Sequence, residues 1–493
     1  MASKPHIVIF PFMAQGHIIP FLALAKTLEQ KTSYTITLVN TPLNIQSLQS
    51  SLPPISTIRL MALPFNGPDH GLPPHTENTD SLPLPLFPNF FKASLALQPS
   101  FEQLISDISQ QEGGPPACII TDMFFGWTVE IARKLGIFHT VFIASGAYGT
   151  ALYFSLWLHL PHLSAANSDE FSAPGFPESG LVHRSQVPSH LLVADGKDYW
   201  SCFHRRQFSL CLSSDGFLFN TVEELEKTGL RYFSRETNRP VWAIGPVTTN
   251  RQNQQMKESV FTTNTCVFSW LDRQPPRSVL YICFGSQCTI SPSQMMELAI
   301  GLESSGQKFI WVVRPPFGFD VNGDFRAEWL PEGFEERITD KKQGILVRKW
   351  APQIEILSHE STGAFLSHCG WNSVLESLRN GVVVIGWPLG GEQTFNSKVL
   401  EEEVGVCVEV ARGCGGEVEK GRVKEVVETV MGETEKGKEM RRKALKVKEM
   451  MKEAIRDDEE FSGSSVRALD DFISTLSECW RGRESEKKIE NEV

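Results

Sequence analysis

The chain has 493 residues, of which 41% are hydrophobic and 21% are charged, and its formal net charge is −11. This composition is typical of a folded globular protein, and the length predicts two large domains or three smaller ones. The acidic balance, without a long basic run, excludes a nucleic-acid partner, because phosphate binding needs clustered Lys and Arg.

The ten cysteines are scattered from Cys118 to Cys479, and none forms a C-x-x-C pair. Disulfide frameworks and zinc sites are therefore not expected, and a reducing, cytoplasmic location is favoured. No apolar stretch reaches the ~18–20 residues that a membrane span needs. Residues 1–12 indicate a core strand rather than a signal peptide, and the charged tail 481–493 excludes a membrane anchor at that end.

The first half of the chain predicts alternating strands and helices. His6–Phe12 is a continuous apolar run, as in a parallel strand that is buried on both faces. The segment Gln15-Gly16-His17 is expected to be a loop, followed by a helix and further strands. The predicted helices are Phe21–Glu29 and Trp127–Leu135, and the strands after the first are Tyr34–Val39, Cys118–Thr121 and Thr140–Ile143. Residues 64–88 and 165–189 are expected to be long surface loops.

The same alternation restarts after residues 248–265, a polar stretch without hydrophobic period that we interpret as an interdomain linker. The last 70 residues look helical, with a short Gly-Ser break at residues 462–465. The predicted strands of this half are Val279–Phe284, Phe309–Val313, Gly344–Val347, Ala364–Ser367 and Val382–Trp387.

This pattern predicts an α/β protein with two facing Rossmann-like domains and a cleft between them. The expected domains are residues 1–247 and 266–465. Residues 466–493 would form a helix and a charged tail that return to the first domain, since apolar positions such as Leu469, Phe472 and Ile473 need a partner. Ligands of such sheets bind beyond the carboxyl ends of the strands, so residues just after predicted strands are candidate site residues.

The most informative segment is residues 350–393, which predicts strand, tight loop, helix and strand. Cys369-Gly370 allows a sharp turn, and Asn372 and Ser373 are favourable N-cap residues. The helix Val374–Arg379 would aim free N–H groups at the cleft, where a phosphate can sit. Each signal alone also has an ordinary structural interpretation, because such a helix start is often only a cap and a lone Trp is often core.

Taken together, residues 350–393 resemble the signature box of plant secondary-product UDP-glycosyltransferases, a branch of glycosyltransferase family 1. The matching motifs are W-A-P-Q, H-C-G-W-N-S, L-E-S, G-W-P and the closing E-Q. The resemblance extends to the opening F-P-F-x-x-Q-G-H-x-x-P and to the motifs at 219–221, 244–246 and 284–286, so it covers essentially the whole chain. It implies the GT-B architecture and a UDP-sugar donor.

The resemblance also implies a role for each matching residue. Uracil would stack on Trp350, the nucleoside would contact Ala351 and Gln353, and the ribose hydroxyls would bind Glu376. The remaining donor-binding residues would be His368, Asn372, Ser373 and Ser286 for the diphosphate, with Gly370 in the same loop, and Trp371, Glu392 and Gln393 for the sugar hydroxyls. Asp is commoner than Glu before the final Gln in this family, and Leu389-Gly390-Gly391 lacks the bulky residues often found there.

Sugar transfer needs a base near the acceptor hydroxyl, and His is the natural choice near neutral pH. His17 follows the first strand, where a catalytic group of this fold would lie, and the resemblance implies that it is the base. Asp122 follows the strand Cys118–Thr121. From the residues alone it is a helix N-cap; the resemblance instead places it beside the base, where a carboxylate orients the imidazole.

The implied reaction is a single displacement at the anomeric carbon that inverts configuration and releases UDP. The sequence contains no Asp-x-Asp, which fits catalysis without a metal, and no cofactor is expected besides UDP-glucose as co-substrate. Glucose is chosen as the donor sugar because the segment 350–393 ends in Gln393. The acceptor is expected to be a small lipophilic phenolic, flavonoid or terpenoid. Its candidate pocket residues are Phe12, Phe90, Phe91, Phe124, Phe125, Trp127 and Trp157.

Two other functions remain open: a UDP-sugar epimerase of the same architecture, and a binding protein on a decayed transferase scaffold. Loss of His17, Asp122 or Glu376 would mark the binding protein, and all three residues are present. We expect a monomer.

Overall fold

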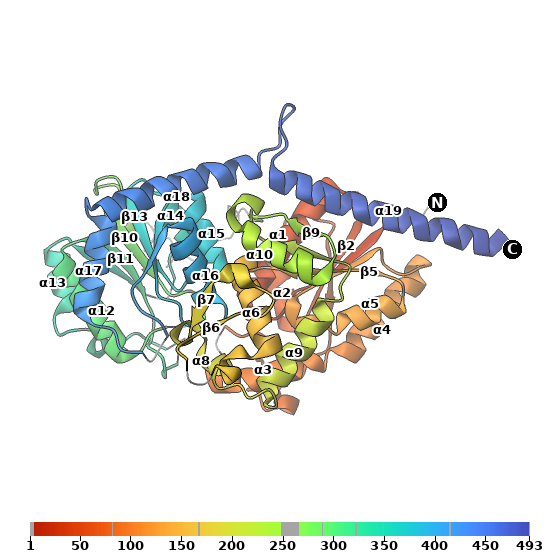
Figure 1. Cartoon of the computed structure of the whole chain (residues 1–493), viewed down its shortest axis with the longest axis horizontal. Coiled ribbons are helices and arrows are strands. Elements are labelled where there is room, and N and C mark those ends of the chain that lie inside the picture. Colours follow the sequence, from red (N-terminus) through yellow and green to blue (C-terminus); the bar gives the residue numbers. More distant parts are fainter. Residues whose placement is uncertain are drawn as a thin grey trace.

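The computed structural model describes residues 4–80, 82–165, 168–247, 266–287, 289–320, 323–348, 350–413 and 416–492. The predicted linker, residues 248–265, lies outside the described residues. The chain forms two α/β halves side by side, and two long C-terminal helices extend across the top of both (Figure 1).

The first half is built on a parallel sheet of seven strands in the order β3-β2-β1-β4-β5-β8-β9. Its strands are buried apolar runs, as the sequence predicts for a sheet covered on both faces. They are β1 His6–Phe10, β2 Thr35–Asn40, β3 Arg59–Ala62, β4 Cys118–Thr121, β5 Phe138–Ile143, β8 Gly216–Phe219 and β9 Val241–Ala243. The helices of this half are α1 Gln15–Lys31, α2 Pro42–Ser51, α3 Phe87–Leu95, α4 Gln98–Glu112, α5 Thr128–Lys134, α6 Ala147–His159, α7 Pro161–Ser164, α8 Ser189–Leu192, α9 Tyr199–Cys211 and α10 Glu223–Thr237.

The second half has a parallel six-stranded sheet in the order β12-β11-β10-β13-β14-β15. Its strands are β10 Val279–Cys283, β11 Lys308–Val313, β12 Gly344–Arg348, β13 Thr362–Ser367, β14 Val383–Gly386 and β15 Cys407–Glu409. Its helices are α12 Pro292–Ser305, α13 Phe334–Asp340, α14 Gln353–Ser358, α15 Trp371–Arg379, α16 Gln393–Val399, α17 Lys420–Met431 and α18 Glu435–Ala454. The prediction of two Rossmann-like domains is therefore confirmed.

The last helix, α19 (Ser464–Glu492), lies against the first half (Figure 1). Its buried residues Leu469 and Phe472 pack in the same apolar cluster as β1 and β9. Asp471 also accepts a hydrogen bond of 2.7 Å from the indole nitrogen of Trp242 on β9. Apolar contact and this bond together hold the first turns of α19 on the first half.

Two local predictions are wrong. The segment Gln15-Gly16-His17 is not a loop, because α1 begins at Gln15 and continues through Pro20. Residues 165–189 are not only loop, since they contain an antiparallel hairpin of β6 (Glu170–Ser172) and β7 (Leu181–His183). Strands of three residues are too short for an alternating pattern to be seen in the sequence.

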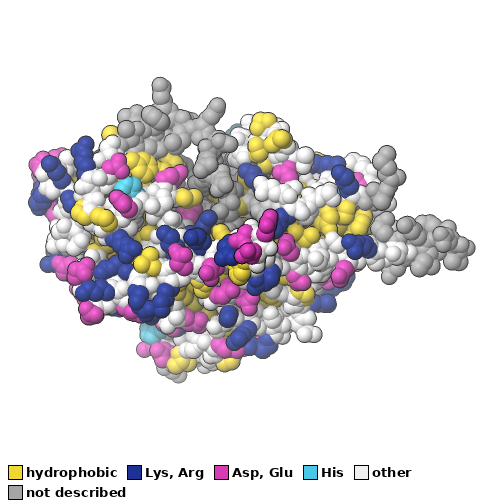
Figure 2. Space-filling model, turned by 90° about the horizontal axis from the view of Figure 1, so that it is seen from above, with side chains coloured by type: hydrophobic (Ala, Val, Ile, Leu, Met, Phe, Trp, Pro, Cys, Tyr) yellow, Lys and Arg dark blue, Asp and Glu magenta, His cyan; other side chains and the backbone are white. Residues whose placement is uncertain are grey.

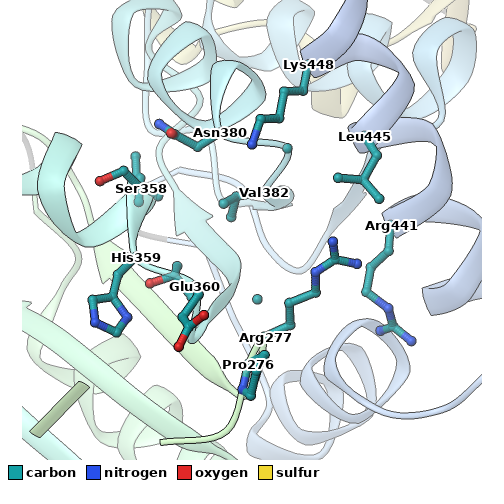
Figure 3. Close-up of a pocket in the computed structure, with 14 residues that line it drawn as sticks. Pro276, Arg277, Ser358, His359, Glu360, Asn380, Val382, Arg441, Leu445 and Lys448 are labelled. Atoms are coloured by element: carbon teal, nitrogen blue, oxygen red, sulfur yellow. The ribbon is translucent and has the colours of Figure 1, made fainter. Parts of the chain in front are cut away.

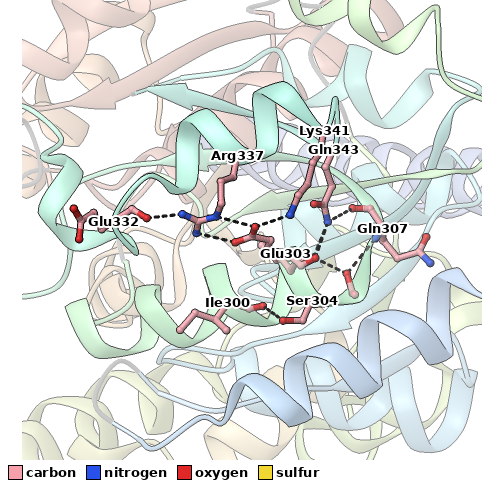
Figure 4. A network of polar contacts seen from close by, with 10 residues as sticks. Ile300, Glu303, Ser304, Gln307, Glu332, Arg337, Lys341 and Gln343 are labelled. Atoms are coloured by element: carbon pink, nitrogen blue, oxygen red, sulfur yellow. Dashed lines mark hydrogen bonds and ion pairs between the residues drawn. The ribbon is translucent and has the colours of Figure 1, made fainter.

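An ion-pair network joins the outer helices of the second half (Figure 4). Glu303 on α12 accepts two hydrogen bonds of 2.9 Å from Arg337 on α13 and one of 2.9 Å from Lys341. The hydrogen bond from Arg337 lowers the pKa of Glu303 to about 2. The nearby Gln343 side chain donates to backbone carbonyls at the end of α12. The network holds α12 and α13 together.

Seen from above, the surface shows Lys and Arg side chains interspersed with Asp and Glu (Figure 2). Among the described residues, no helix combines the length and the apolar character that crossing a membrane requires.

Candidate active site

Both sheets place the predicted site residues at the point where the strand order reverses. In the first sheet the reversal lies between β1 and β4, which are followed by His17 and Asp122. In the second it lies between β10 and β13, which are followed by Ser286 and His368. Ligands of open parallel sheets bind at such switch points, so the two halves of the site are located by topology alone.

His17 and Asp122 form a hydrogen-bonded pair. His17 Nδ1 lies 2.6 Å from Asp122 Oδ2, although the two residues are 105 positions apart in the chain. Asp122 is 1% exposed, whereas the His17 side chain is 25% exposed. The buried carboxylate therefore holds one ring nitrogen, and the rest of the imidazole remains accessible.

Asp122 also caps a helix, as the residues alone suggested. Its second oxygen, Oδ1, accepts a hydrogen bond of 3.1 Å from the backbone N–H of Phe124, at the start of the short 3₁₀ helix η3 (Met123–Phe125). The cap and the bond to His17 use different oxygens. The helix thus fixes the carboxylate that in turn fixes the imidazole.

The pKa of His17 is raised above its ordinary value. Burial alone lowers this pKa, but the charge of Asp122 and its hydrogen bond raise it more, and the charge of Glu392 raises it further. Glu392 belongs to the second half of the chain, so both halves act on the imidazole. A raised pKa makes His17 a stronger base once it has lost its proton.

Two aromatic rings flank His17. The ring centroids of Phe12 and Phe124 lie 5.8 Å and 5.7 Å from that of the imidazole. Phe124 in turn packs 6.0 Å from His204, at the edge of a larger aromatic cluster. The other predicted pocket residues, Phe90, Phe91, Phe125, Trp127 and Trp157, are buried in the apolar core of the first half.

His368 is held between two glycines. A side chain at Gly285 or Gly370 would approach the imidazole to 2.8 Å or 2.4 Å, so glycine is required at both positions. Burial and then the positive charge of Arg314 lower the pKa of His368 to about 4. The ring is consequently neutral at pH 7 and carries one N–H donor.

The prediction that Asn372 and Ser373 cap the helix after His368 is wrong. α15 begins at Trp371 with Gly370 as its N-cap, and no side chain caps it. The left-handed residue of the turn is Cys369, at φ 62°, whereas Gly370 has φ −62°. Asn372 and Ser373 lie inside the first turn, and their side chains bond to other elements instead of to their own helix.

The side chains that the family resemblance assigns to the nucleoside lie close to one another. Gln353 Nε2 donates to Ser373 Oγ at 3.0 Å and to Glu376 Oε2 at 2.7 Å. Trp350 is 45% exposed, as a stacking platform for a base would be, whereas Ala351 is buried in the core of the second half.

The start of α15 bonds directly to the first half. The indole N–H of Trp371 donates to the carbonyl of Asn220 at 2.8 Å. Asn372 Nδ2 donates to the carbonyl of Gly16 at 2.9 Å. The indole N–H of Trp371 is therefore bonded to the first half, and Gly16, the partner of Asn372, directly precedes His17.

The side chains of Glu392 and Gln393, the last of the predicted donor-binding residues, also form hydrogen bonds within the protein. Glu392 Oε1 accepts a hydrogen bond of 3.0 Å from Ser145 Oγ, which follows β5 in the first half. Gln393 Oε1 accepts from the backbone N–H groups of Leu389 and Gly390 at 2.9 Å and 3.1 Å. Within the described part of the chain, the amide nitrogen of Gln393 has no hydrogen-bond partner.

Sequence reasoning assigned no role to four residues of this region, three of them polar. Ser145 follows a predicted strand and could have been found by the rule applied to Asp122. Arg314 follows β11 in the same way, and it donates to the carbonyls of Gly285 and Ser286. Asn220 and Pro20 lie in motifs of the family resemblance, but the motifs do not indicate their roles, which depend on contacts between the two halves.

A separate cavity of about 350 Å³ lies at the amino ends of the strands of the second sheet, whereas Ser286 and His368 follow the carboxyl ends. It is lined by residues before β10, β13 and β14, among them Arg277 and Glu360, and by Arg441 and Lys448 of α18 (Figure 3). None of the predicted site residues lines it. Within the described ranges, no cluster of three His, Cys, Asp or Glu side chains could hold a metal ion.

The fold and the site match a known family. The family model described as "UDP-glucoronosyl and UDP-glucosyl transferase" matches residues 266–446. The chain is 47% identical over 481 residues to UDP-glycosyltransferase 92A1 of Arabidopsis thaliana, covering 96% of this chain and 97% of that one. The chain thus belongs to the UDP-glycosyltransferases, enzymes that transfer a glycosyl group from a UDP-sugar.

Two further comparisons agree with this membership. Crocetin glucosyltransferase 3 of Crocus sativus is 47% identical over 453 residues, covering 88% of this chain and 92% of that relative. A Glycyrrhiza uralensis glycosyltransferase, solved in complex with glycyrrhetinic acid 3-O-monoglucuronide, superposes with a TM-score of 0.82 at 28% identity over 99% of both chains.

Proposed function

We propose that this chain transfers glucose from UDP-glucose to a hydroxyl, or a carboxyl, of a small lipophilic acceptor such as a phenolic, flavonoid or terpenoid, with inversion at the anomeric carbon. The observation that carries the proposal is the His17–Asp122 pair, with its 2.6 Å bond, beside a helix start that bonds to Gly16. This arrangement supports a base and a donor site that lie next to each other.

In the proposed reaction, the acceptor oxygen attacks the anomeric carbon while its proton moves to His17 Nε2. The bond between that carbon and the diphosphate oxygen breaks, and UDP leaves with the bonding electrons. Neutral His17 carries its proton on Nδ1, which donates to Asp122, so Nε2 has the free lone pair. Asp122 also stabilises the imidazolium that forms.

The leaving diphosphate would lie at the start of α15, near Ser286, Asn372, Ser373 and the neutral His368. N–H groups at a helix start and preorganised donors stabilise the negative charge that develops on UDP. Glu376 would bind the ribose, and Glu392 and the amide of Gln393 would bind the sugar. The Crocus relative is named a crocetin glucosyltransferase, which supports glucose as the transferred sugar.

We assign residues 1–247 to acceptor binding and residues 266–465 to donor binding, with residues 466–493 returning to the first domain. The rings of Phe12 and Phe124 beside His17 support an apolar acceptor.

The test is UDP release from UDP-glucose, measured with and without a panel of phenolic and terpenoid acceptors, with products identified by mass. Acceptor-dependent release with a mass gain of one hexose is expected. Tight UDP binding without turnover on any acceptor would instead indicate a binding protein, and conversion of the UDP-sugar alone would indicate an epimerase.

A second arm tests the leaving group. Excess EDTA is expected to leave the rate unchanged, because the groups above meet the charge of UDP. Loss of activity in EDTA, restored by magnesium or manganese, would contradict this part of the proposal.

A further inference from the structure

Helix α1 contains a proline where a helix interior normally excludes one. Pro20 is buried at the sixth position of α1, after the first turn. It has no N–H to donate to the carbonyl of Gly16, four residues earlier, and its ring crowds that same carbonyl. An unbroken helix would pair Gly16 O with the N–H of residue 20.

The carbonyl freed in this way has a partner in the other half of the molecule. Gly16 O accepts the 2.9 Å hydrogen bond from Asn372 Nδ2. The bond joins the first turn of α1 to the first turn of α15. Since Gly16 directly precedes His17, it connects the base to the helix start that would face the donor.

Two effects of the proline favour this bond. Without a competing N–H, the carbonyl is available to the amide of Asn372. Crowding by the ring also turns the carbonyl away from the helix axis, which is the direction in which a partner outside the helix can reach it. Gly16 itself adds no obstruction, because a side chain there would meet nothing within 4 Å.

We propose that Pro20 is a positioning residue for sugar transfer. By leaving the Gly16 carbonyl to Asn372, it sets His17 against the donor helix. The proposal rests on the proposed function. It differs from a packing role, in which Pro20 would only fill space in the core.

The test compares Pro20→Ala and Pro20→Val with the wild type. Both variants restore the N–H, and valine also fills the space of the ring. In both, we expect kcat at saturating substrates to fall by about tenfold, because a misplaced base costs rate. The midpoint of thermal unfolding should stay the same or rise, since α1 regains a hydrogen bond, and the Kd for UDP should change less than threefold.

A double-mutant cycle identifies the partner. Asn372→Ala removes the bond from the other side, so adding Pro20→Ala to it should lower kcat no further. Pro99→Ala is the matched control, because Pro99 lies in the first turn of α4, where its missing N–H would have no helical partner. This control should keep wild-type kcat and stability.

Three results would overturn the proposal: unchanged kcat in Pro20→Ala, full rescue by Pro20→Val, or an equal loss from Pro20→Ala with and without Asn372. The first points to no role, the second to packing, and the third to another partner. Failure of the proposed function would be seen separately, as absence of acceptor-dependent turnover in the wild type, and the inference would fall with it.

Discussion

The proposed catalytic pair and the proposed donor-binding loop differ in how their side chains are hydrogen-bonded. On the first sheet, His17 and Asp122 already have the geometry that the proposed roles require, with one ring nitrogen bound and the rest of the ring accessible. On the second sheet, several of the polar side chains that we assign to the donor are bonded to one another, to their own loop or to the first half. Gln353 bonds to Ser373 and Glu376, for example, in place of a nucleoside.

This difference implies different costs of substrate binding. The acceptor hydroxyl can meet His17 without breaking a protein hydrogen bond. The nucleoside must replace the bonds of Gln353 to Ser373 and Glu376 with its own, so each new contact contributes only the difference in free energy. Changes at the catalytic pair should therefore lower kcat, whereas changes around Gln353 should weaken donor binding.

The largest effect is expected for His17→Ala. Loss of the base should lower kcat by ~10²–10⁴-fold on a weakly acidic alcohol, while the Kd for UDP stays nearly unchanged. Steady-state kinetics and calorimetry with UDP measure the two quantities. His159→Ala, at the exposed end of α6, is the control, and near-normal rates in His17→Ala would remove the base from the mechanism.

Asp122→Asn should cost less, about 10–100-fold in kcat, because the imidazole keeps a hydrogen-bonding partner but loses the charge that stabilises its protonated form. The pH dependence of kcat/KM tests the direction in which Asp122 shifts the pKa of His17. Asp122 raises the pKa of His17, and the base acts when deprotonated, so the wild-type ascending limb of kcat/KM should lie above pH 6.5. In the variant this limb should shift to lower pH; a shift to higher pH, or none, would contradict the pairing.

Much of this arrangement could be predicted from sequence because it follows from buried strands. Continuous apolar runs located β1, β4, β10 and β13, and the residues after them form the two switch points. Short strands such as β9, with three residues, gave no signal. The α15 cap was assigned wrongly because Asn372 and Ser373 have favourable capping side chains, which here have tertiary partners.

The partners of Trp371 and Asn372 lie in the other half of the molecule, so no local pattern contains them. The same holds for Pro20, which precedes the helix predicted from Phe21 but lies inside α1. Its place inside α1 is understandable only once Gly16 O is seen to have another donor.

On the donor side, Glu376→Gln should weaken UDP binding by about tenfold, since hydrogen bonds to charged groups are worth roughly 1.5–3 kcal/mol and part is offset by the lost bond to Gln353. At saturating UDP-glucose, kcat should stay within about threefold of the wild type. Calorimetry with UDP and donor-saturation kinetics separate the two effects. Glu355→Gln, an exposed carboxylate on the neighbouring α14, is the matched control; a loss in kcat with unchanged Kd would place Glu376 on the catalytic side of the comparison.

The smallest effect concerns the choice of sugar. Gln393 Oε1 is held by Leu389 N–H and Gly390 N–H, so this residue offers the sugar one donor rather than a donor and an acceptor. A single hydrogen bond to one hydroxyl supports modest discrimination, and we expect Gln393→His to reduce the ratio of kcat/KM for UDP-glucose over UDP-galactose by about 3–10-fold. The substitution also frees two backbone N–H groups, so the thermal midpoint should fall slightly.

Gln393→Glu is the informative companion, because its carboxylate can still accept from the loop but has no amide to donate. If Gln393→Glu and Gln393→His lose selectivity equally, the amide is what reads the sugar. If Gln393→Glu keeps the wild-type ratio, Gln393 only orders its loop, and the choice of donor lies with Glu392 or with residues outside this pair.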